Sequence, residues 1–302
     1  MQMTNLDNNM ENMMKLAQIG LENGRDYSGI QTMKRISGGS VNEAFYVQTI
    51  DAEFFMKFHA NSPKGFFRSE ALGLRRIKET QTISVPNYLS YSDQPGNAFL
   101  MLTWIEGKKN EKTEEILGQK LAQLHQCFGR MHGLQEDSYI GLLRQPNELN
   151  ANWLEYYRDK RLQNQIDIGV EKGYIEGKRH KHLVKLQENL GKWIPSFVEP
   201  SHLHGDLYSG NWIVGPGGEP FIVDPSFLYG DRHFEMAYTE LFGGLPSKFY
   251  QAYQESYPLR EDYEDIKPLY QLYYLLAHLN LFGESYGESI DVILDKYVGK
   301  LS

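Results

Sequence analysis

Residues 201–226 constrain the fold more than any other part of the chain. The segment reads SHLHGDLYSGNWIVGPGGEPFIVDPS, and two short apolar runs at 212–214 and 221–223 are joined by the sequence GPGG at 215–218. Short apolar runs on either side of a glycine- and proline-rich turn are typical of a tight β-hairpin. We therefore expect the chain to reverse here and to bring the end of the second run back beside the loop that precedes the first.

Three polar side chains flank the predicted hairpin. Asp206 belongs to the sequence HGD before the first run, Asn211 directly precedes that run, and Asp224 directly follows the second. An acid that accepts a hydroxyl proton, with an amide and a second acid as oxygen ligands of Mg²⁺, is the set that phosphoryl transfer from ATP requires. A lone Asp or Asn after a strand is usually a turn or cap residue, but these three in this order predict a phosphotransfer site.

Length and charge limit the kinds of protein that can carry this site. With 302 residues the chain is long enough for two lobes, each with its own core. Its formal net charge of −8 argues against nucleic acid or an anionic membrane surface as a partner. We expect neither, and an anionic substrate would need local cations.

The cysteine content and the N-terminus indicate the compartment. The one cysteine, Cys127, excludes an intrachain disulfide and fits a reducing environment, and its apolar neighbours favour a packed thiol over a nucleophile. The N-terminus lacks a charged-then-apolar signal pattern, and no run approaches the roughly 20 apolar residues of a membrane span. We expect a cytoplasmic protein.

The first third of the chain is rich in predicted strands. Residues 1–26 have apolar positions at helical spacing and predict a helix that packs on the first lobe. Residues 41–48 and 53–58 predict a strand pair, preceded by a turn with Gly38 and Gly39. Glycines let backbone amides approach phosphates closely, although an ordinary bend would have the same composition.

A single lysine, Lys57, lies inside the apolar run FFMKF. Because an unpaired buried ammonium is costly, this lysine needs an anion. Residues 64–80 predict a helix, with Glu70 near its apolar face. A Lys57–Glu70 ion pair would satisfy both charges and hold the ammonium where nucleotide phosphates can reach it. The alternative is a lysine that snorkels at a sheet edge beside a solvated glutamate.

A second strand pair is predicted at 88–91 and 98–105, and the polar sequence EGKK follows it. This change marks a predicted boundary between an N-terminal lobe of residues 1–105 and a C-terminal lobe of residues 106–302. If an adenine binds at the junction, the Thr103 carbonyl and the Ile105 amide are its edge contacts, with Leu102 behind the ring. A plain interlobe linker would have the same composition.

The C-terminal lobe is mainly helical by its periodicity. The predicted helices cover residues 114–128, 152–166, 179–190, 235–242, 247–257 and 266–282. The last is rich in aromatic residues and is expected to be buried. No internal repeat or low-complexity segment is found.

From residue 36 to residue 282 the chain resembles the fructosamine kinase (ketosamine-3-kinase) family, a branch of the aminoglycoside phosphotransferases. The resemblance rests on motifs spread over this range: ISGGSVNEAF, FMKF, SEALGLRRI, LGQKLAQLHQ, SYIGLLRQPN, HGDLYSGN, VDPSFLYGDR, TELFGG and PLYQLYYLLAHLNLFG. It implies an α+β, protein-kinase-like fold of two lobes, with a small β-rich N-terminal lobe and a larger, mainly helical C-terminal lobe. It also implies ATP and Mg²⁺ as cofactors.

The resemblance assigns roles to the residues found above. Asp206 is then the catalytic base, Asn211 and Asp224 are the Mg²⁺ ligands, and Lys57 with Glu70 positions the nucleotide under the glycine turn. The implied acceptor is the 3-hydroxyl of a ketosamine, such as a sugar attached to lysine by early glycation, and the implied role is deglycation or sugar-amine metabolism.

Two further residues follow from the resemblance. Asp231 in the sequence GDR is expected to brace the catalytic loop. Tyr208 stands where the family usually has Trp, so an aromatic ring beside the acceptor sugar is kept but is smaller, and the preferred sugar or amine substituent can differ. Thr103 replaces an acidic residue common in relatives, which matters little if only its carbonyl is used.

Two other functions remain open at this level. A kinase of another small alcohol, such as an aminoglycoside or choline, would share every catalytic residue. A nucleotide-binding protein without catalysis is the other alternative, and the intact set of Lys57, Asp206, Asn211 and Asp224 argues against it. The sequence does not indicate protein partners.

Overall fold

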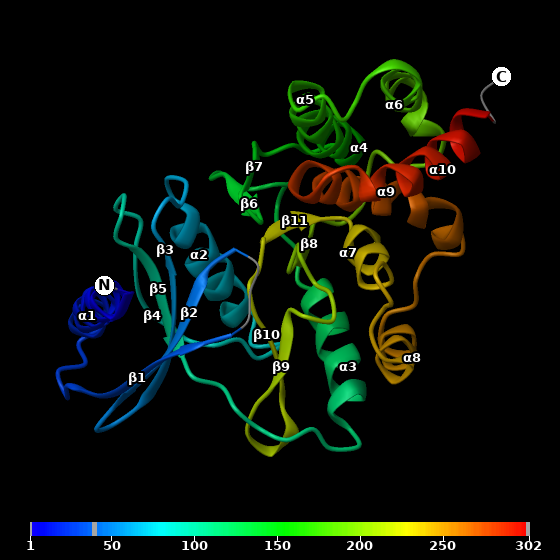
Figure 1. The fold of residues 1–302 in the computed structure, drawn as a ribbon. Coiled ribbons are helices and arrows are strands. Elements are labelled where there is room, and N and C mark those ends of the chain that lie inside the picture. Colours follow the sequence, from blue (N-terminus) through cyan, green and yellow to red (C-terminus); the bar gives the residue numbers. More distant parts are fainter. Residues whose placement is uncertain (1, 38–40, 300–302) are drawn as a thin grey trace.

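The structure is a computed structural model that describes residues 2–37 and 41–299. It has two lobes, a β-rich N-terminal one and a larger helical one (Figure 1), as the sequence predicts. Gly38 and Gly39 of the predicted phosphate turn lie outside the described residues. The elements of the N-terminal lobe are α1 (Gln2–Asn23), β1 (Ile30–Ile36), β2 (Glu43–Thr49), β3 (Glu53–His59), α2 (Phe66–Glu79), β4 (Tyr88–Ser92) and β5 (Ala98–Thr103).

The five strands form one antiparallel sheet in the order β1-β2-β3-β5-β4. Both predicted strand pairs are present. The edge strand β1 was not predicted, because its sequence IQTMKRI is half polar and no residue in it is fully buried. Ile30 and Met33 pack on a core cluster of the lobe without being fully buried, so this edge strand has no clear alternating apolar pattern to detect.

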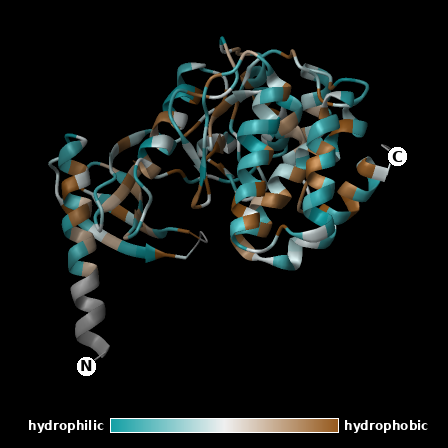
Figure 2. Ribbon diagram, turned by 90° about the horizontal axis from the view of Figure 1, so that it is seen from above, coloured by the Kyte–Doolittle hydropathy of each residue, from teal (hydrophilic) through white to brown (hydrophobic). Residues whose placement is uncertain are grey.

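Side chains that alternate across β3 divide the lobe into two cores. Met56 and Phe58 face α1, which contributes Met13, Ala17 and Leu21 to the outer core. The prediction that the N-terminal helix packs on the first lobe is therefore confirmed, and Figure 2 shows α1 on the outer side of the sheet, away from the C-terminal lobe. Lys57, between Met56 and Phe58, points to the opposite face, toward α2.

The C-terminal lobe surrounds the central helix α9 (Tyr263–Phe282), most of whose residues are buried. The other helices are α3 (Thr113–His125), α4 (Trp153–Tyr156), α5 (Gln163–Glu171), α6 (Gly177–Asn189), α7 (Arg232–Thr239), α8 (Ser247–Ser256) and α10 (Gly287–Val298). Short strand pairs join them: β6 (Ser138–Ile140) with β7 (Leu143–Gln145), β8 (Ser201–Leu203) with β11 (Leu228–Gly230), and β9 (Trp212–Val214) with β10 (Pro220–Ile222).

Each predicted helix of this lobe is present with shifted ends. The one predicted at 152–166 consists of α4, a π-helical stretch at Tyr157–Leu162 and α5. Helix α7 begins at Arg232, three residues before its predicted start, and α10 was not predicted.

The connection from Thr103 at the end of β5 to Thr113 at the start of α3 contains the expected lobe boundary. No helix among the described residues has the length and apolar character needed to cross a bilayer.

Candidate active site

A cavity of about 940 Å³ lies between the lobes and is lined by residues of both. It brings together every described residue that was predicted to contact nucleotide, metal or acceptor or to act as the base. From the N-terminal lobe it is lined by Lys57, Glu70, Leu102, Thr103 and Ile105, and from the C-terminal lobe by Asp206, Tyr208, Asn211 and Asp224. The side chains at the lobe junction thus form a wall of the cavity where an adenine was predicted.

The predicted hairpin is confirmed as β9 and β10, in which Ile213 pairs with Phe221. One residue beyond β10, the Val223 amide donates to the Asn211 carbonyl at 3.0 Å, so the strand end is fixed beside the start of the hairpin. This bond places Asp224 next to Asn211. The backbone of Asp224 is left-handed, with φ of 60°, a conformation that Asp tolerates better than most residues and that recurs at functional sites.

Helix α2 positions Glu70 at the inner face of the sheet. Its first turn has no side-chain cap of its own, and Asp93 from the β4–β5 turn accepts hydrogen bonds from the amides of Phe67 and Arg68 at 2.9 and 3.1 Å. A carboxylate at a helix N-terminus satisfies otherwise unpaired amides and favours the helix dipole. The end of α2 nearest Glu70 is therefore tied to the sheet.

Lys57 is 4% exposed, and its Nζ lies 2.7 Å from Glu70 Oε1, which confirms the predicted pair. A second carboxylate, Asp224 Oδ1, lies 2.6 Å from the same nitrogen and was not predicted as its partner. Burial disfavours the charged lysine, but Asp224 and Glu70 together raise its pKa above the usual value. Burial raises the pKa of Glu70 to about 7, although Lys57 opposes the shift.

Asp206 lines the cavity and is half-buried, five residues before Asn211 in the chain. The Asn211 amide nitrogen donates to the Asp206 carbonyl at 2.8 Å and to its carboxylate at 3.3 Å. Burial raises the pKa of Asp206 to about 8, and the Asp224 carboxylate adds to the shift, while a hydrogen bond from the Tyr238 hydroxyl opposes it. In its ionised form a carboxylate with a raised pKa is a stronger base, and a pKa near the working pH suits a general base.

Tyr238 was not predicted at the site. Its ring stacks on that of Tyr274 with centroids 3.8 Å apart and an angle of 8°, and the Tyr274 hydroxyl donates to the Gly205 carbonyl at 3.1 Å. Tyr208, the expected sugar-facing ring, lines the cavity with its centroid 6.2 Å from that of Tyr238. The two tyrosines form the aromatic side of the space in front of Asp206.

The loop that carries Asp206 is held by Glu235, a fully buried residue of α7. Its carboxylate accepts hydrogen bonds from the amides of His204 at 3.2 Å and Gly205 at 2.5 Å, and lies 2.8 Å from His125 Nε2. The sequence analysis treated Glu235 only as the start of a helix. A lone acid among the apolar residues of FEMAY is the same kind of signal that identified Lys57, and it could have marked this residue.

Asp231, expected to brace the catalytic loop, has another role. It caps α7 by accepting from the His233 amide at 3.0 Å, and it contacts His233 Nδ1 and the Tyr270 hydroxyl, both at 2.6 Å. Burial opposes ionisation of this acid, but His233 and these hydrogen bonds lower the pKa of Asp231 below its usual value. Asp231 therefore joins α7 to α9, and the expectation was wrong because Glu235, one helical turn later, faces the loop.

The residues at the hairpin fit a magnesium ion. The Asn211 amide nitrogen is used on Asp206, so its oxygen is the atom left to face a cation, and Asp224 supplies a half-exposed carboxylate beside it. No group of three or more His, Cys, Asp or Glu side chains suited to a metal occurs in the described part of the chain. Magnesium is commonly held by only one or two carboxylates, with waters and substrate phosphates as the other ligands.

Known proteins resemble this chain over nearly its whole length. A "probable ketoamine kinase" of Enterococcus faecium is 36% identical over 263 residues, which cover 87% of this chain and 94% of the relative. A chloroplastic protein-ribulosamine 3-kinase of Arabidopsis thaliana is 34% identical, covering 88% of this chain and 82% of the relative.

The fold has solved counterparts as well. The crystal structure of a "putative fructosamine-3-kinase" of Haemophilus somnus superposes with a TM-score of 0.82 at 31% identity, covering 92% of this chain and 95% of that one. A thermostable aminoglycoside phosphotransferase, solved with AMP-PNP and hygromycin B, shares the kinase-like fold with a TM-score of 0.61 at 12% identity, covering 92% and 98%. The sequence model described as fructosamine kinase matches residues 12–300, and the chain is therefore a member of the fructosamine kinase family and an ATP-dependent phosphotransferase.

Proposed function

We propose that the protein transfers the γ-phosphoryl group of ATP to the 3-hydroxyl of a ketosamine, a sugar joined to an amine as in fructosamines and ribulosamines. The observation that carries the proposal is the position of Asp206 beside Asn211 and Asp224, in a cavity that Lys57 borders from the other lobe. A phosphotransferase uses an acid that lies near metal-binding oxygens, here those of Asn211 and Asp224, and near a fixed positive charge, here the Lys57 ammonium.

In this mechanism Asp206 orients the acceptor hydroxyl and takes its proton as the sugar oxygen bonds to the γ-phosphorus. The bond from that phosphorus to the β-phosphate oxygen breaks, and ADP leaves. Lys57 holds the nucleotide phosphates, and Gly38 and Gly39, which lie outside the described residues, are the proposed backbone contacts to them. Magnesium, when bound, supplies positive charge that offsets the charge of the phosphates, and Asn211 with Asp224 would hold it.

The acceptor class is supported by the names of the relatives, which act on ketoamines or ribulosamines according to those names. We propose a small glycated amine, or a glycated lysine, as the acceptor of this chain. Its phosphorylated product would decompose and free the amine, so the role would be deglycation or sugar-amine metabolism.

A substrate panel tests the proposal. ATP consumption is measured with fructosyl and ribulosyl derivatives of lysine, with aminoglycosides and with choline, and the phosphorylated position is found by NMR. We expect turnover on ketosamines with the phosphate on oxygen 3, and none in Asp206→Asn beyond a trace. Turnover on aminoglycosides or choline alone, or phosphate on another oxygen, would refute the assignment of the acceptor.

A further inference from the structure

The turn that follows α7 carries an exposed aromatic ring in a strained backbone. Phe242 is 45% exposed, and its φ of 56° is in the left-handed region, which is uncommon for a bulky residue other than glycine. Such a conformation is unfavourable and persists where the surrounding structure imposes it, often at functional sites. Asn or Gly would fit this backbone better, so the ring needs an explanation.

Phe242 belongs to an aromatic wall, which we define as Phe242, His278, Phe282 and Tyr286, and in which His278 contacts the other three rings. The Phe242 centroid lies 4.6 Å from that of His278 and 6.0 Å from that of Tyr286, and His278 lies 5.5 Å from Phe282. Phe282, at the end of α9, is 54% exposed. Two large apolar side chains from different elements, Phe242 and Phe282, therefore pack on His278 and stay partly open to solvent.

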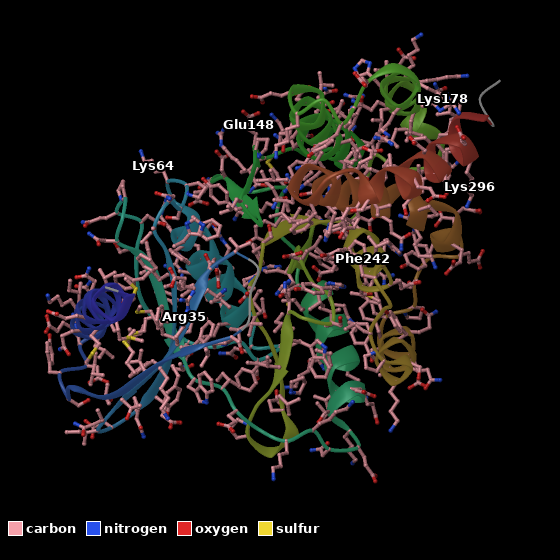
Figure 3. The ribbon with its side chains drawn as sticks, in the orientation of Figure 1. Arg35, Lys64, Glu148, Lys178, Phe242 and Lys296 are labelled. Atoms are coloured by element: carbon pink, nitrogen blue, oxygen red, sulfur yellow. The ribbon has the colours of Figure 1, made fainter. Side chains whose placement is uncertain are left out.

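The aromatic wall is continuous with the catalytic cavity. Phe242, His278 and Phe282 line the same cavity as Asp206, and the Phe242 ring lies 6.3 Å from that of Tyr238. Figure 3 labels Phe242 in the C-terminal lobe beside α7, the helix that carries Tyr238. Part of an acceptor that extends past the sugar on this side would pass over Phe242.

The charges in the cavity also differ between its two ends. Among the described residues that line it, the carboxylates are Glu70, Asp206 and Asp224, and all three belong to the catalytic end. The aromatic wall offers ring faces and edges instead. Ring faces attract cations such as a protonated secondary amine, and they pack on methylene groups.

We propose that Phe242 and Phe282 form a subsite for the substituent on the amine of the acceptor, and that this subsite favours an extended aliphatic chain such as a lysine side chain. The inference rests on the proposed function and adds a specificity-determining role for the aromatic wall. The sugar hydroxyl is fixed at Asp206, the sugar lies beside Tyr208, and the amine substituent continues over Phe242 toward the opening.

The test uses one sugar with amine substituents of increasing length. Fructosyl methylamine, butylamine and hexylamine are compared with the intact protein by kcat/KM. Because each buried methylene contributes to binding, we expect kcat/KM to rise on the order of tenfold from methyl to hexyl. In Phe242→Asn we expect this ratio to fall to within about twofold of unity.

Two further variants and a thermal melt of Phe242→Asn test whether a change in the ratio is specific to the aromatic wall. Phe282→Ser, changed on α9 and not on the turn, should reduce the same ratio. Phe197→Asn, which removes another highly exposed ring from the loop between α6 and β8, should leave the ratio as in the parent. Phe242→Asn should melt no lower than the parent, because Asn tolerates a left-handed backbone.

The outcomes separate this inference from the proposed function. If the parent phosphorylates ketosamines without any dependence on chain length, or if Phe242→Asn lowers kcat/KM equally for all three amines, the subsite is refuted and the kinase assignment stands. Equal loss would mean that the ring contacts the sugar and not the substituent. If the parent acts on no ketosamine, the proposed function fails and the subsite fails with it.

Discussion

Substitutions of the buried Lys57–Glu70 pair can distinguish its contribution to the stability of this protein from its contribution to activity. The side chains are 5% and 11% exposed, and the third member, Asp224, is 44% exposed. Lys57→Met leaves Glu70 buried without its cation, whereas Lys57→Met with Glu70→Leu removes both charges and replaces them with apolar groups of similar size. Asp224 can turn to solvent in either variant.

The expected magnitudes follow from the burial. Removing one partner of a buried ion pair costs about 3–5 kcal/mol, because an uncompensated charge remains, while replacing both partners by apolar residues is often neutral or stabilising. We expect Lys57→Met to lose about 3 kcal/mol of unfolding free energy. The double variant should lie within about 1 kcal/mol of the parent. Both should lose ATP-dependent turnover, since neither retains the ammonium.

The single variant should also depend on pH in a defined direction. Burial already raises the pKa of Glu70 to about 7 against the opposing effect of Lys57, so removal of Lys57 raises it further. The folded state then binds more protons than the unfolded state above the unfolded pKa of the acid. The unfolding free energy of Lys57→Met should therefore fall as pH rises from 5 to 8, by up to about 1.4 kcal/mol per pH unit.

Urea denaturation followed by fluorescence at pH 5, 6, 7 and 8 measures these effects, with turnover measured in parallel. The double variant is the matched control, because it lacks the acid and should show no such fall. The reasoning would be refuted if Lys57→Met were as stable as the double variant at pH 8, or if either variant kept turnover within threefold of the parent.

Four other substitutions test separate parts of the site. Asp206→Asn should lower kcat by about 10²–10⁴ with ATP affinity retained by calorimetry, and turnover within threefold of the parent would remove this residue as the base. Glu235→Gln leaves one loop amide without its carboxylate acceptor and should lower kcat roughly tenfold with little change in KM, whereas an unchanged kcat would show that the loop holds its shape without the acid. Because His233 lowers the pKa of Asp231, the parent should lose stability as pH falls below about 4, and Asp231→Asn should show a smaller loss in acid denaturation; equal slopes would contradict this. Tyr208→Trp should shift the kcat/KM ratio between fructosyl and ribulosyl lysine without changing ATP affinity, and equal changes for both sugars would make Tyr208 a packing residue only.

Local sequence patterns were sufficient to predict several parts of this structure. The hairpin 212–222 follows from turn residues between two apolar runs, and its strands lie within a few residues of each other, so no long-range contact is needed to form it. The charged partner of Lys57 could be predicted because a buried ammonium requires an anion and the next helix offers Glu70 on its inner face.

Other features depend on contacts between distant segments, which no local pattern contains. Asp224 pairs with Lys57 across 167 positions of sequence, and Glu235 reaches the catalytic loop only because α7 packs against β8. Asp231 was assigned to that loop since its place in the chain did not reveal which of two acids, one helical turn apart, faces it.

The type of chemistry at the site could therefore be predicted from residue types and spacing. The pKa values of its acids and the surroundings of Phe242 depend on the tertiary structure. The raised pKa of Asp206 arises from burial and from Asp224, and the burial exists only once distant segments of the C-terminal lobe, such as α7 with Tyr238, pack around the loop that carries Asp206. The exposed, left-handed Phe242 is likewise visible only when the turn after α7 meets the end of α9. Burial and long-range proximity are properties of the folded chain, because they depend on which surfaces meet after the local elements have formed.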